Sequence, residues 1–384
     1  MAFITRFMQG SDQSFFLFGP RGTGKSTWVK QHFKSALYID LLAPDVYRSY
    51  AAKPERLREV AEAQQTLSTI VIDEIQKLPQ LLDVVHLLIE KRPEWRFVMT
   101  GSSARKLKRS GVDLLAGRAI LKAMHPFMAA ELSDLFSIEE VLATGMVPLI
   151  KYSSNPKETL STYVALYLRE EVQMEGLVRN IGAFSRFLES ASFSHGAVLN
   201  ISDVARDCQV GRKTVEGYFS ILEDLLLAFR LPMFTKRAKR NLSSHPKFFY
   251  FDAGVFRSMR PSGPLDSPQE IDGAALEGLV AQHLRAWCSY GGDENRLFFW
   301  RTKSGNEVDF VVYGQDTFYA IEVKNADRVH SKSVKGLLAF KQDYPQANTC
   351  LLYRGKERIK IKGILCLPCE EFLVNLVPNK PITL

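Results

Sequence analysis

The sequence of 384 residues predicts an α/β protein with three domains, and one observation supports each domain. Residues 1–135 alternate short apolar runs with amphipathic stretches, which is typical of a parallel sheet covered by helices. Residues 136–260 favour helices followed by a short strand pair, which is the order of a winged helix. Residues 261–384 return to strand-like runs, so we expect a separate small α/β domain there.

Four apolar runs in the first domain predict buried strands. They cover residues 14–18, 37–40, 69–74 and 97–101. Apolar spacing predicts helices over residues 27–33 and 81–90, and a further helix opens at residues 102–104. Because the strand runs are continuously apolar rather than alternating, we expect a sheet that is covered on both faces.

The other two domains show different patterns. In the middle domain, residues 200–211 and 212–222 predict helix, turn and helix, and residues 230–250 alternate short strands with a basic turn. A linker rich in Pro and Ser follows at residues 261–268. The last domain predicts a helix over residues 273–288 and another over 334–340, with strands at 297–300, 307–312, 318–323 and 350–353.

Composition and charge narrow the function classes. With 46% apolar and 24% charged residues, the chain is neither a disordered protein nor a small disulfide scaffold. Residues 151–260 contain 16 Lys and Arg against 11 Asp and Glu, which favours a polyanionic partner. The five cysteines are scattered and no apolar run is long enough to span a membrane, so we expect a cytoplasmic protein without a membrane partner.

A glycine-rich loop follows the first predicted strand. Residues 19–26 read Gly-Pro-Arg-Gly-Thr-Gly-Lys-Ser and satisfy the phosphate-binding pattern G-x4-G-K-[ST] between a strand and a helix. Glycines let backbone N–H groups point at phosphate oxygens, Lys25 adds a positive charge, and Ser26 offers a hydroxyl to Mg²⁺. We therefore expect ATP and Mg²⁺ as cofactors, bound by Gly19, Pro20, Arg21, Gly22, Thr23, Gly24, Lys25, Ser26 and Thr27.

Acidic and polar residues end the next strands. Asp73 and Glu74 follow an apolar strand, where Asp73 can hold the Mg²⁺ shell and Glu74 can polarise the attacking water. The strand at residues 97–101 places Thr100 at the same edge, where it can contact the γ-phosphate or water. Ser102 suits the same contact or a helix N-cap equally well.

Several segments together resemble a family. They are Gly19–Thr27, Ile72–Lys77, Met99–Ser103, Ala116–Arg118 with Pro126, Phe127 and Glu131, and Phe248–Gly254. They look like prokaryotic AAA-type (AAA+) ATPases, in which a P-loop domain precedes a C-terminal region of unknown function. The resemblance implies an AAA+ core with Thr100 or Ser102 as sensor 1, Arg118 as a trans-acting arginine finger, and a homo-oligomer such as a hexameric ring. A surface salt bridge is the equally weighted alternative for Arg118.

Basic residues mark the predicted winged helix. Arg212 and Lys213 begin its second helix, where they suit phosphate contact. Lys236, Arg237, Lys239 and Arg240 lie in the predicted wing, which can rest on a DNA backbone without reading its sequence. The alternative is a helical packing domain with a solvated basic loop.

The last domain contains acids and a lysine in a suggestive order. Asp309 lies on one predicted strand, and Glu322 and Lys324 project to the same face of the next. Asp309 and Glu322 can bind Mg²⁺, while Lys324 orients a water for phosphodiester attack and Glu277 reaches the same metal from the preceding helix. These four residues resemble the PD-(D/E)XK fold of restriction endonucleases and Holliday-junction resolvases. The alternatives are a degenerate nuclease fold kept for binding, or an ordinary Glu–Lys pair.

Three functions fit these features. The first is an ATP-driven motor that migrates or remodels branched or junction DNA and carries a nuclease-like domain that binds, and in one version cleaves, DNA. The second is a nucleotide-controlled switch whose last domain binds proteins. The third is a structure-specific nuclease gated by ATP. The motor is the preferred hypothesis, and its link to junctions rests on analogy.

Overall fold

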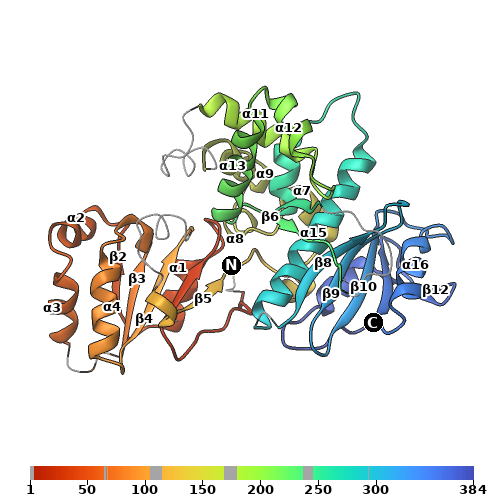
Figure 1. The fold of residues 1–384 in the computed structure, drawn as a ribbon. Helices are drawn as coiled ribbons and strands as arrows, with labels where there is room; N and C mark the ends of the chain where they lie inside the picture. Colours follow the sequence, from red (N-terminus) through yellow and green to blue (C-terminus); the bar gives the residue numbers. More distant parts are fainter. Residues whose placement is uncertain are drawn as a thin grey trace. The chain divides into compact units, whose positions relative to one another are not determined.

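The computed structural model describes residues 4–64, 66, 68–103, 115–167, 180–236, 245–292 and 294–384. The chain divides into two compact units, whose elements are labelled in Figure 1. One unit contains Met8–His125 and Asp224–Leu226, and the other contains Met1–Phe7, Pro126–Glu223 and Leu227–Leu384. Within the described residues, we find no helix with the length and apolar character needed to cross a membrane.

The first unit is built on a five-stranded parallel sheet. Its strands are β1 (Phe15–Phe18), β2 (Leu37–Asp40), β3 (Thr69–Asp73), β4 (Arg96–Gly101) and β5 (Ile120–Ala123), in the order β2-β3-β4-β1-β5. The first four strands were predicted to within one residue at each end. The fifth strand, β5, was not predicted. The predicted parallel α/β arrangement of this segment is confirmed.

Helices cover both faces of this sheet. They are α1 (Lys25–His32), α2 (Pro44–Ala52), α3 (Arg56–Glu62) and α4 (Leu81–Lys91), with 3-10 turns η1 (Ile75–Lys77) and η2 (Leu115–Gly117). Phe16, Ile72 and Met99 pack in one core with residues of α2, α3 and α4. Their neighbours Phe15 and Leu17 are also fully buried, as expected for a sheet covered on both sides.

The strand order brings three chain segments to one edge of the sheet. β1, β3 and β4 run parallel, so their carboxyl ends face the same side. The loop at residues 19–24 leaves β1, Glu74 follows β3, and Thr100 lies near the end of β4. Ligands of open parallel sheets bind at such an edge, which makes it the first place to look for a site.

The second unit begins with a helical region. Its helices are α6 (Ala129–Leu132), α7 (Ile138–Thr144), α8 (Pro148–Lys151), α9 (Pro156–Thr162), α11 (Ile181–Ser192), α12 (Ile201–Cys208), α13 (Arg212–Asp224) and α14 (Ala253–Met259), with the short turns η3 (Ser133–Leu135) and η4 (Tyr163–Tyr167). A hairpin-like antiparallel pair, β6 (Ala228–Leu231) and β7 (Lys247–Tyr250), follows α13. The predicted helix, turn, helix and strand-pair order is therefore present.

The segment around Asp252 locks two of these helices together. Asp252 accepts backbone hydrogen bonds from Met146 at 2.7 Å and from Val255 at 3.1 Å. Gly254 lies so close to Thr144 that an added Cβ would stand 2.4 Å from its carbonyl carbon. Burial raises the pKa of Asp252 to about 6. Asp252 and Gly254, which belong to one of the segments that resemble the ATPase family, therefore have a packing role.

A six-stranded sheet completes the second unit. The long helix α15 (Pro268–Tyr290) leads into β8 (Arg296–Arg301), β9 (Glu307–Tyr313), β10 (Phe318–Lys324), α16 (Lys335–Asp343), β11 (Asn348–Tyr353), β12 (Ile359–Ile361), β13 (Ile364–Pro368) and α17 (Cys369–Asn375). The sheet order is β12-β13-β11-β10-β9-β8, antiparallel from β8 to β10 and parallel from β10 to β13. The predicted boundary at residue 260 stays a prediction, because the structure groups both sides of it in one unit.

Candidate functional site

The loop between β1 and α1 is folded around the side chain of Lys25. Gly22 and Gly24 have φ angles of 81° and 91°, a left-handed conformation that glycine adopts without steric cost. Lys25 is buried, and its Nζ donates to the carbonyl oxygens of Gly19 at 2.7 Å and Pro20 at 3.2 Å. The ammonium therefore lies inside the loop, where the phosphate-binding motif requires it.

Two further contacts fix the shape of this loop. Thr23 donates its hydroxyl to the carbonyl oxygen of Pro20 at 2.8 Å. Gly19 has no room for a side chain, since an added Cβ would stand 2.5 Å from the carbonyl oxygen of Met124. Gly24 is the N-cap of α1, so the positive end of the helix dipole faces the loop. Arg21 and Thr27 are exposed on the same segment.

Asp73, at the end of β3, is surrounded by hydroxyl groups. Ser26 donates to its Oδ1 at 3.1 Å, Thr100 donates to the same oxygen, and Tyr38 donates to Oδ2. The Asp73 side chain is buried, and burial together with this carboxylate raises the pKa of Tyr38. A buried carboxylate that accepts several hydrogen bonds is fixed in place, as a ligand of a bound cation must be.

Glu74 lies next to this carboxylate in an uncommon backbone conformation. Its φ of 61° is left-handed, which costs a residue with a side chain about 1–2 kcal/mol. Its N–H donates to the hydroxyl of Thr100 at 3.2 Å, and its carboxylate accepts a hydrogen bond from Gln76. Gln76 also donates to Ser102 at 3.2 Å. Thr100 and Gln76 therefore hold the backbone and the side chain of Glu74 respectively.

Arg118 lies elsewhere in the same unit. It follows η2 and Gly117, whose φ is 83°. Its guanidinium forms an ion pair with Glu90 of α4 at 2.6 Å, and its side chain remains 37% exposed. The surface salt bridge expected as the alternative is thus present within the chain, while a role in a neighbouring subunit stays a prediction.

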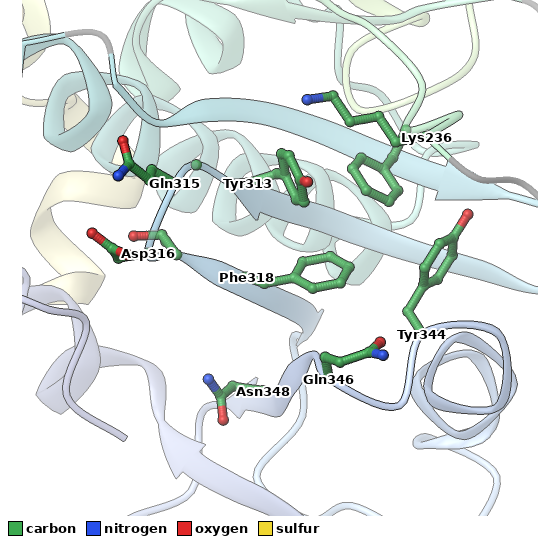
Figure 2. A pocket seen from close by; sticks show the side chains of 11 residues that line it. Lys236, Tyr313, Gln315, Asp316, Phe318, Tyr344, Gln346 and Asn348 are labelled. Carbon is green, nitrogen blue, oxygen red and sulfur yellow. The ribbon is translucent and has the colours of Figure 1, made fainter.

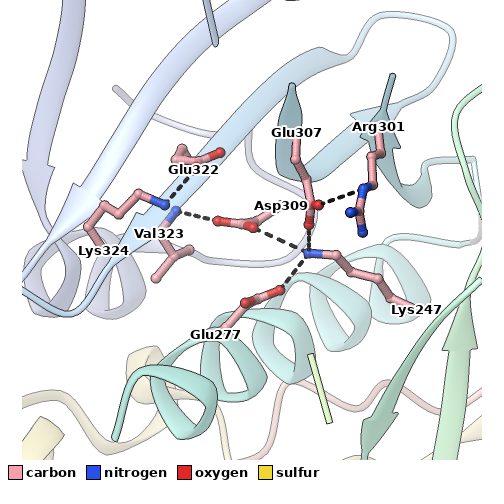
Figure 3. A network of polar contacts seen from close by, with 8 residues as sticks. All are labelled: Lys247, Glu277, Arg301, Glu307, Asp309, Glu322, Val323 and Lys324. Atoms are coloured by element: carbon pink, nitrogen blue, oxygen red, sulfur yellow. Dashed lines mark hydrogen bonds and ion pairs between the residues drawn. The ribbon is translucent and has the colours of Figure 1, made fainter. Parts of the chain in front are cut away.

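The predicted acid–lysine cluster of the second unit contains an additional lysine (Figure 3). Lys247 of β7 is 2% exposed, and its Nζ lies 2.9 Å from Glu277, 2.5 Å from Glu307 and 3.3 Å from Asp309. Burial alone would lower the pKa of Lys247, but the charges of Glu277, Asp309 and Glu307 raise it well above its ordinary value. The acids therefore surround an ammonium ion.

The two predicted Mg²⁺ ligands have different partners in this cluster. Asp309 also accepts from the backbone N–H of Val323 at 2.9 Å, whereas Glu322 pairs with Lys324 at 2.5 Å. Burial, followed by the charge of Asp309, raises the pKa of Glu322 to about 8. In the described part of the chain, no three His, Cys, Asp or Glu side chains are grouped so as to hold a metal ion. The magnesium pair stays a prediction.

The predicted DNA-contacting residues lie in several places. Arg212 forms an i,i+4 ion pair with Glu216 at 3.2 Å, and Lys213 is exposed beside it. Arg237, Lys239 and Arg240 fall outside the described residues.

Lys236 lies over the ring of Tyr313, 4.2 Å from its centroid, at a cavity of about 800 Å³ in the second unit (Figure 2). The aromatic walls of this cavity come from Phe234, Tyr313, Phe318 and Tyr344. Lys236 therefore packs on an aromatic surface of the six-stranded sheet, and its contact with DNA stays a prediction.

Known families match the chain in three consecutive stretches. Residues 11–133 match the model of an AAA domain. We refer to this stretch as the AAA domain. Residues 135–266 and 272–372 match two domains of unknown function, DUF8612 and DUF4143. The predicted combination of an AAA-type ATPase domain with a C-terminal region of unknown function is confirmed, while its winged-helix and nuclease-like parts stay predictions.

Individual proteins are similar over most of the chain. Uncharacterized proteins of Mycobacterium bovis and Mycobacterium tuberculosis are each 26% identical, over 94% of this chain and 80% of their own length. Among solved structures, the replication initiator DnaA bound to AMPPCP and single-stranded DNA is 13% identical, covers 55% of this chain and 82% of its own, and has a TM-score of 0.28. That score is too low to support an argument.

The AAA domain offers the groups that a magnesium nucleotide needs. Its loop presents backbone N–H groups, a helix N-terminus and the ammonium of Lys25 for phosphates. Ser26 and Asp73 place a hydroxyl and a carboxylate 3.1 Å apart beside that loop, and oxygen ligands of this kind are preferred by Mg²⁺. The residues present therefore fit both groups.

Sequence reasoning missed four residues of these clusters. In the AAA domain, Tyr38 and Gln76 contact Asp73 and Glu74. In the second unit, Lys247 and Glu307 belong to the acid–lysine cluster. The sequence did offer a signal for Lys247, because this lysine begins the apolar strand KFFY. Lysine is rarely buried unless it is paired with an acid, so a lysine in such a strand indicates acidic partners.

Proposed function

We propose that the AAA domain hydrolyses ATP with Mg²⁺ at the carboxyl edge of its sheet. The main support is the position of Ser26 beside Asp73, which joins the phosphate-binding loop to the acidic end of β3. When bound with the nucleotide, Mg²⁺ neutralises charge on the phosphate oxygens.

Each residue of the site has a distinct task in this proposal. The loop and Lys25 bind the phosphates, and Ser26 and Asp73 hold the metal ion. Glu74 accepts a proton from the water that attacks the γ-phosphorus, while the bond to the ADP oxygen breaks. Thr100 fixes the direction of Glu74 and Asp73 through its hydroxyl. Arg118 of a neighbouring subunit stabilises the transferring phosphoryl group, once it leaves its pair with Glu90.

A direct test measures nucleotide binding and phosphate release by the purified chain. Lys25→Ala removes the ammonium inside the loop, and we expect loss of both binding and turnover. Lys34→Ala, at an exposed position just after α1, is the matched control and should behave like the wild type. Full ATP turnover by Lys25→Ala would overturn the proposal.

We extend the proposal to DNA, with branched or junction DNA as the substrate that the ATPase remodels. The support is the basic surplus of residues 151–260, together with Arg212 and Lys213 at the exposed start of α13. In this proposal the last domain, with Glu277, Asp309, Glu322 and Lys324, binds the DNA and cleaves it when a metal ion is bound.

The test of this extension compares ATP hydrolysis without DNA, with duplex DNA and with a four-way junction. The motor hypothesis predicts a several-fold stimulation by the junction, which Arg212→Ala with Lys213→Ala reduces. A rate that is the same with every DNA would favour a nucleotide-controlled switch instead. Cleavage without strand movement, lost in Asp309→Ala, would favour a nuclease gated by ATP.

A further inference from the structure

The cluster around Lys247 combines residues from distant parts of the second unit. Lys247 comes from β7, Glu277 from α15, and Glu307 and Asp309 from β9. All three acids place an oxygen within 3.3 Å of the Lys247 ammonium. The lysine therefore lies at the common centre of the three acids (Figure 3).

The charges of this cluster make the central cation necessary. Side-chain exposure is 19% for Glu277, 29% for Glu307 and 10% for Asp309. Carboxylates at this depth repel one another strongly and need a partner of opposite charge. Arg301 adds a second cation, 3.5 Å from Glu307, but at the rim of the cluster.

A second observation concerns Glu322, the other proposed metal ligand, which pairs with Lys324 and not with Lys247. Glu322 is nine-tenths buried, and its Oε1 binds Lys324. Its Oε2 is buried without a hydrogen-bond partner among the described residues. Buried carboxylate oxygens normally have a partner, so this atom indicates that a ligand can be accepted there.

A metal ion would draw the same acids closer to one centre than the Lys247 ammonium does. Mg²⁺ and Mn²⁺ bind oxygen at about 2.1 Å with six ligands, whereas an ammonium hydrogen bond is close to 2.8 Å. The oxygens of Glu307, Glu277 and Asp309 lie 2.5, 2.9 and 3.3 Å from Nζ. Both cations neutralise the same acids, so they compete for one position.

We propose that Lys247 is a built-in cation that fills this acidic cluster, so that the cluster takes a divalent metal ion only when the Lys247 ammonium is absent from it. The inference rests on the proposed role of Asp309 and Glu322 as metal ligands. It predicts that the chain as folded does not load a metal at its nuclease-like site, and that Lys247 controls this loading.

The experiment measures Mn²⁺ binding to the full chain by calorimetry and by its effect on Tm. Every protein in the comparison carries Asp73→Asn and is free of nucleotide, so that the AAA domain contributes no cation site. Lys247→Met replaces the ammonium with an apolar side chain of similar length. Lys332→Met, at an exposed lysine, is the control.

We expect Lys247→Met to bind one Mn²⁺ at least 100-fold more tightly than the parent protein, with a rise in Tm on metal addition that the parent does not show. Adding Asp309→Asn to Lys247→Met should abolish both effects. If Lys247→Met fails to fold alone, Mn²⁺ should restore its circular dichroism spectrum, whereas the double variant should fold without metal.

Two results would overturn the inference, and they differ in what they say about the proposed function. Mn²⁺ binding by the parent protein that depends on Asp309 would show that Lys247 does not block the site, and the proposed metal ligands would stand. No Mn²⁺ binding or refolding in Lys247→Met, with the double variant folded, would reject the metal site as well.

Discussion

The hydroxyl of Ser26 lies 3.1 Å from Oδ1 of Asp73, although 47 positions separate the two residues in the chain. The contact exists because β1 and β3 lie in one parallel sheet with β4 between them, so that the loop after β1 and the end of β3 meet at one edge. The proposed ATPase depends on this relationship.

Removing the Ser26 hydroxyl should weaken the use of Mg²⁺ more than the binding of nucleotide. Ser26→Ala leaves Asp73 with the hydroxyls of Thr100 and Tyr38 but removes a metal ligand. We expect the Mg²⁺ concentration for half-maximal hydrolysis to rise about 10-fold. This corresponds to a loss of about 1.4 kcal/mol in the binding free energy of the metal ion. A magnesium titration tests this, with Ser35→Ala, at an exposed position, as control. An unchanged titration curve would remove Ser26 from the metal site.

Gln76 should act as a positioning residue for Glu74. Its amide donates to the Glu74 carboxylate and to Ser102. Gln76→Ala frees that carboxylate, and a displaced catalytic group can cost up to about 100-fold in rate. We expect kcat to fall while KM for ATP stays constant, and Gln76→Glu to behave worse than Gln76→Asn because it repels Glu74. Equal changes in kcat and KM across all three variants would indicate a general packing defect.

Arg118 should matter only between subunits. Arginine fingers contribute about 10³-fold or more to turnover, so Arg118→Ala should lose most hydrolysis while binding ATP normally. Mixing it with Lys25→Ala tests the trans role, because each variant then supplies what the other lacks. We expect partial recovery of hydrolysis in the mixture. Without recovery in a mixed oligomer, Arg118 would be no more than the partner of Glu90.

His283 should make the second unit sensitive to acid. Its Nε2 accepts from the backbone N–H of Ala129 at 2.8 Å and its Nδ1 contacts the carbonyl of Leu279, so the neutral ring is held on both sides. Burial lowers its pKa to about 4 from 6.5. The unfolded chain therefore binds a proton in this window while the folded chain does not, and stability falls as pH drops from 6.5 to 4.

The loss should reach about 3 kcal/mol at the lower end of this window. Urea unfolding of the wild type and of His283→Gln, between pH 4 and 7.5, measures it. We expect His283→Gln to have a flatter stability curve, and His330→Gln, at an exposed position, to follow the wild type. Parallel curves for all three proteins would contradict the buried neutral ring.

The predictable part of the fold is the part with strong local signals. Continuous apolar runs predicted β1 to β4, and the G-x4-G-K-[ST] pattern located the phosphate loop. β5 was missed; it is an edge strand of four residues in which Ile120 and Leu121 are exposed, unlike the buried residues of β1 and β3. The last strands β12 and β13, of three and five residues, were also missed.

The candidate sites were predictable where their chemistry is local. Asp73 and Glu74 follow a strand in sequence, so they could be assigned directly. The contacts of Tyr38 with Asp73 and of Lys247 with Asp309 span 35 and 62 positions. The first depends on the pairing of β2 with β3, whereas the second joins β7 and β9, which belong to different sheets. A sequence pattern carries no information on such pairs until the strand order is known.

The measurement that tests the central claim most directly is ATP hydrolysis by the wild type and Glu74→Gln, together with ATP binding by both. Glu74→Gln keeps the size of the side chain and one oxygen that can accept from Gln76, but it removes the proton acceptor, which is worth about 10²–10⁴ in rate. We predict that the variant binds ATP as tightly as the wild type and hydrolyses it at least 100-fold more slowly. Equal hydrolysis by both proteins would contradict the assignment of this edge of the sheet as the catalytic site.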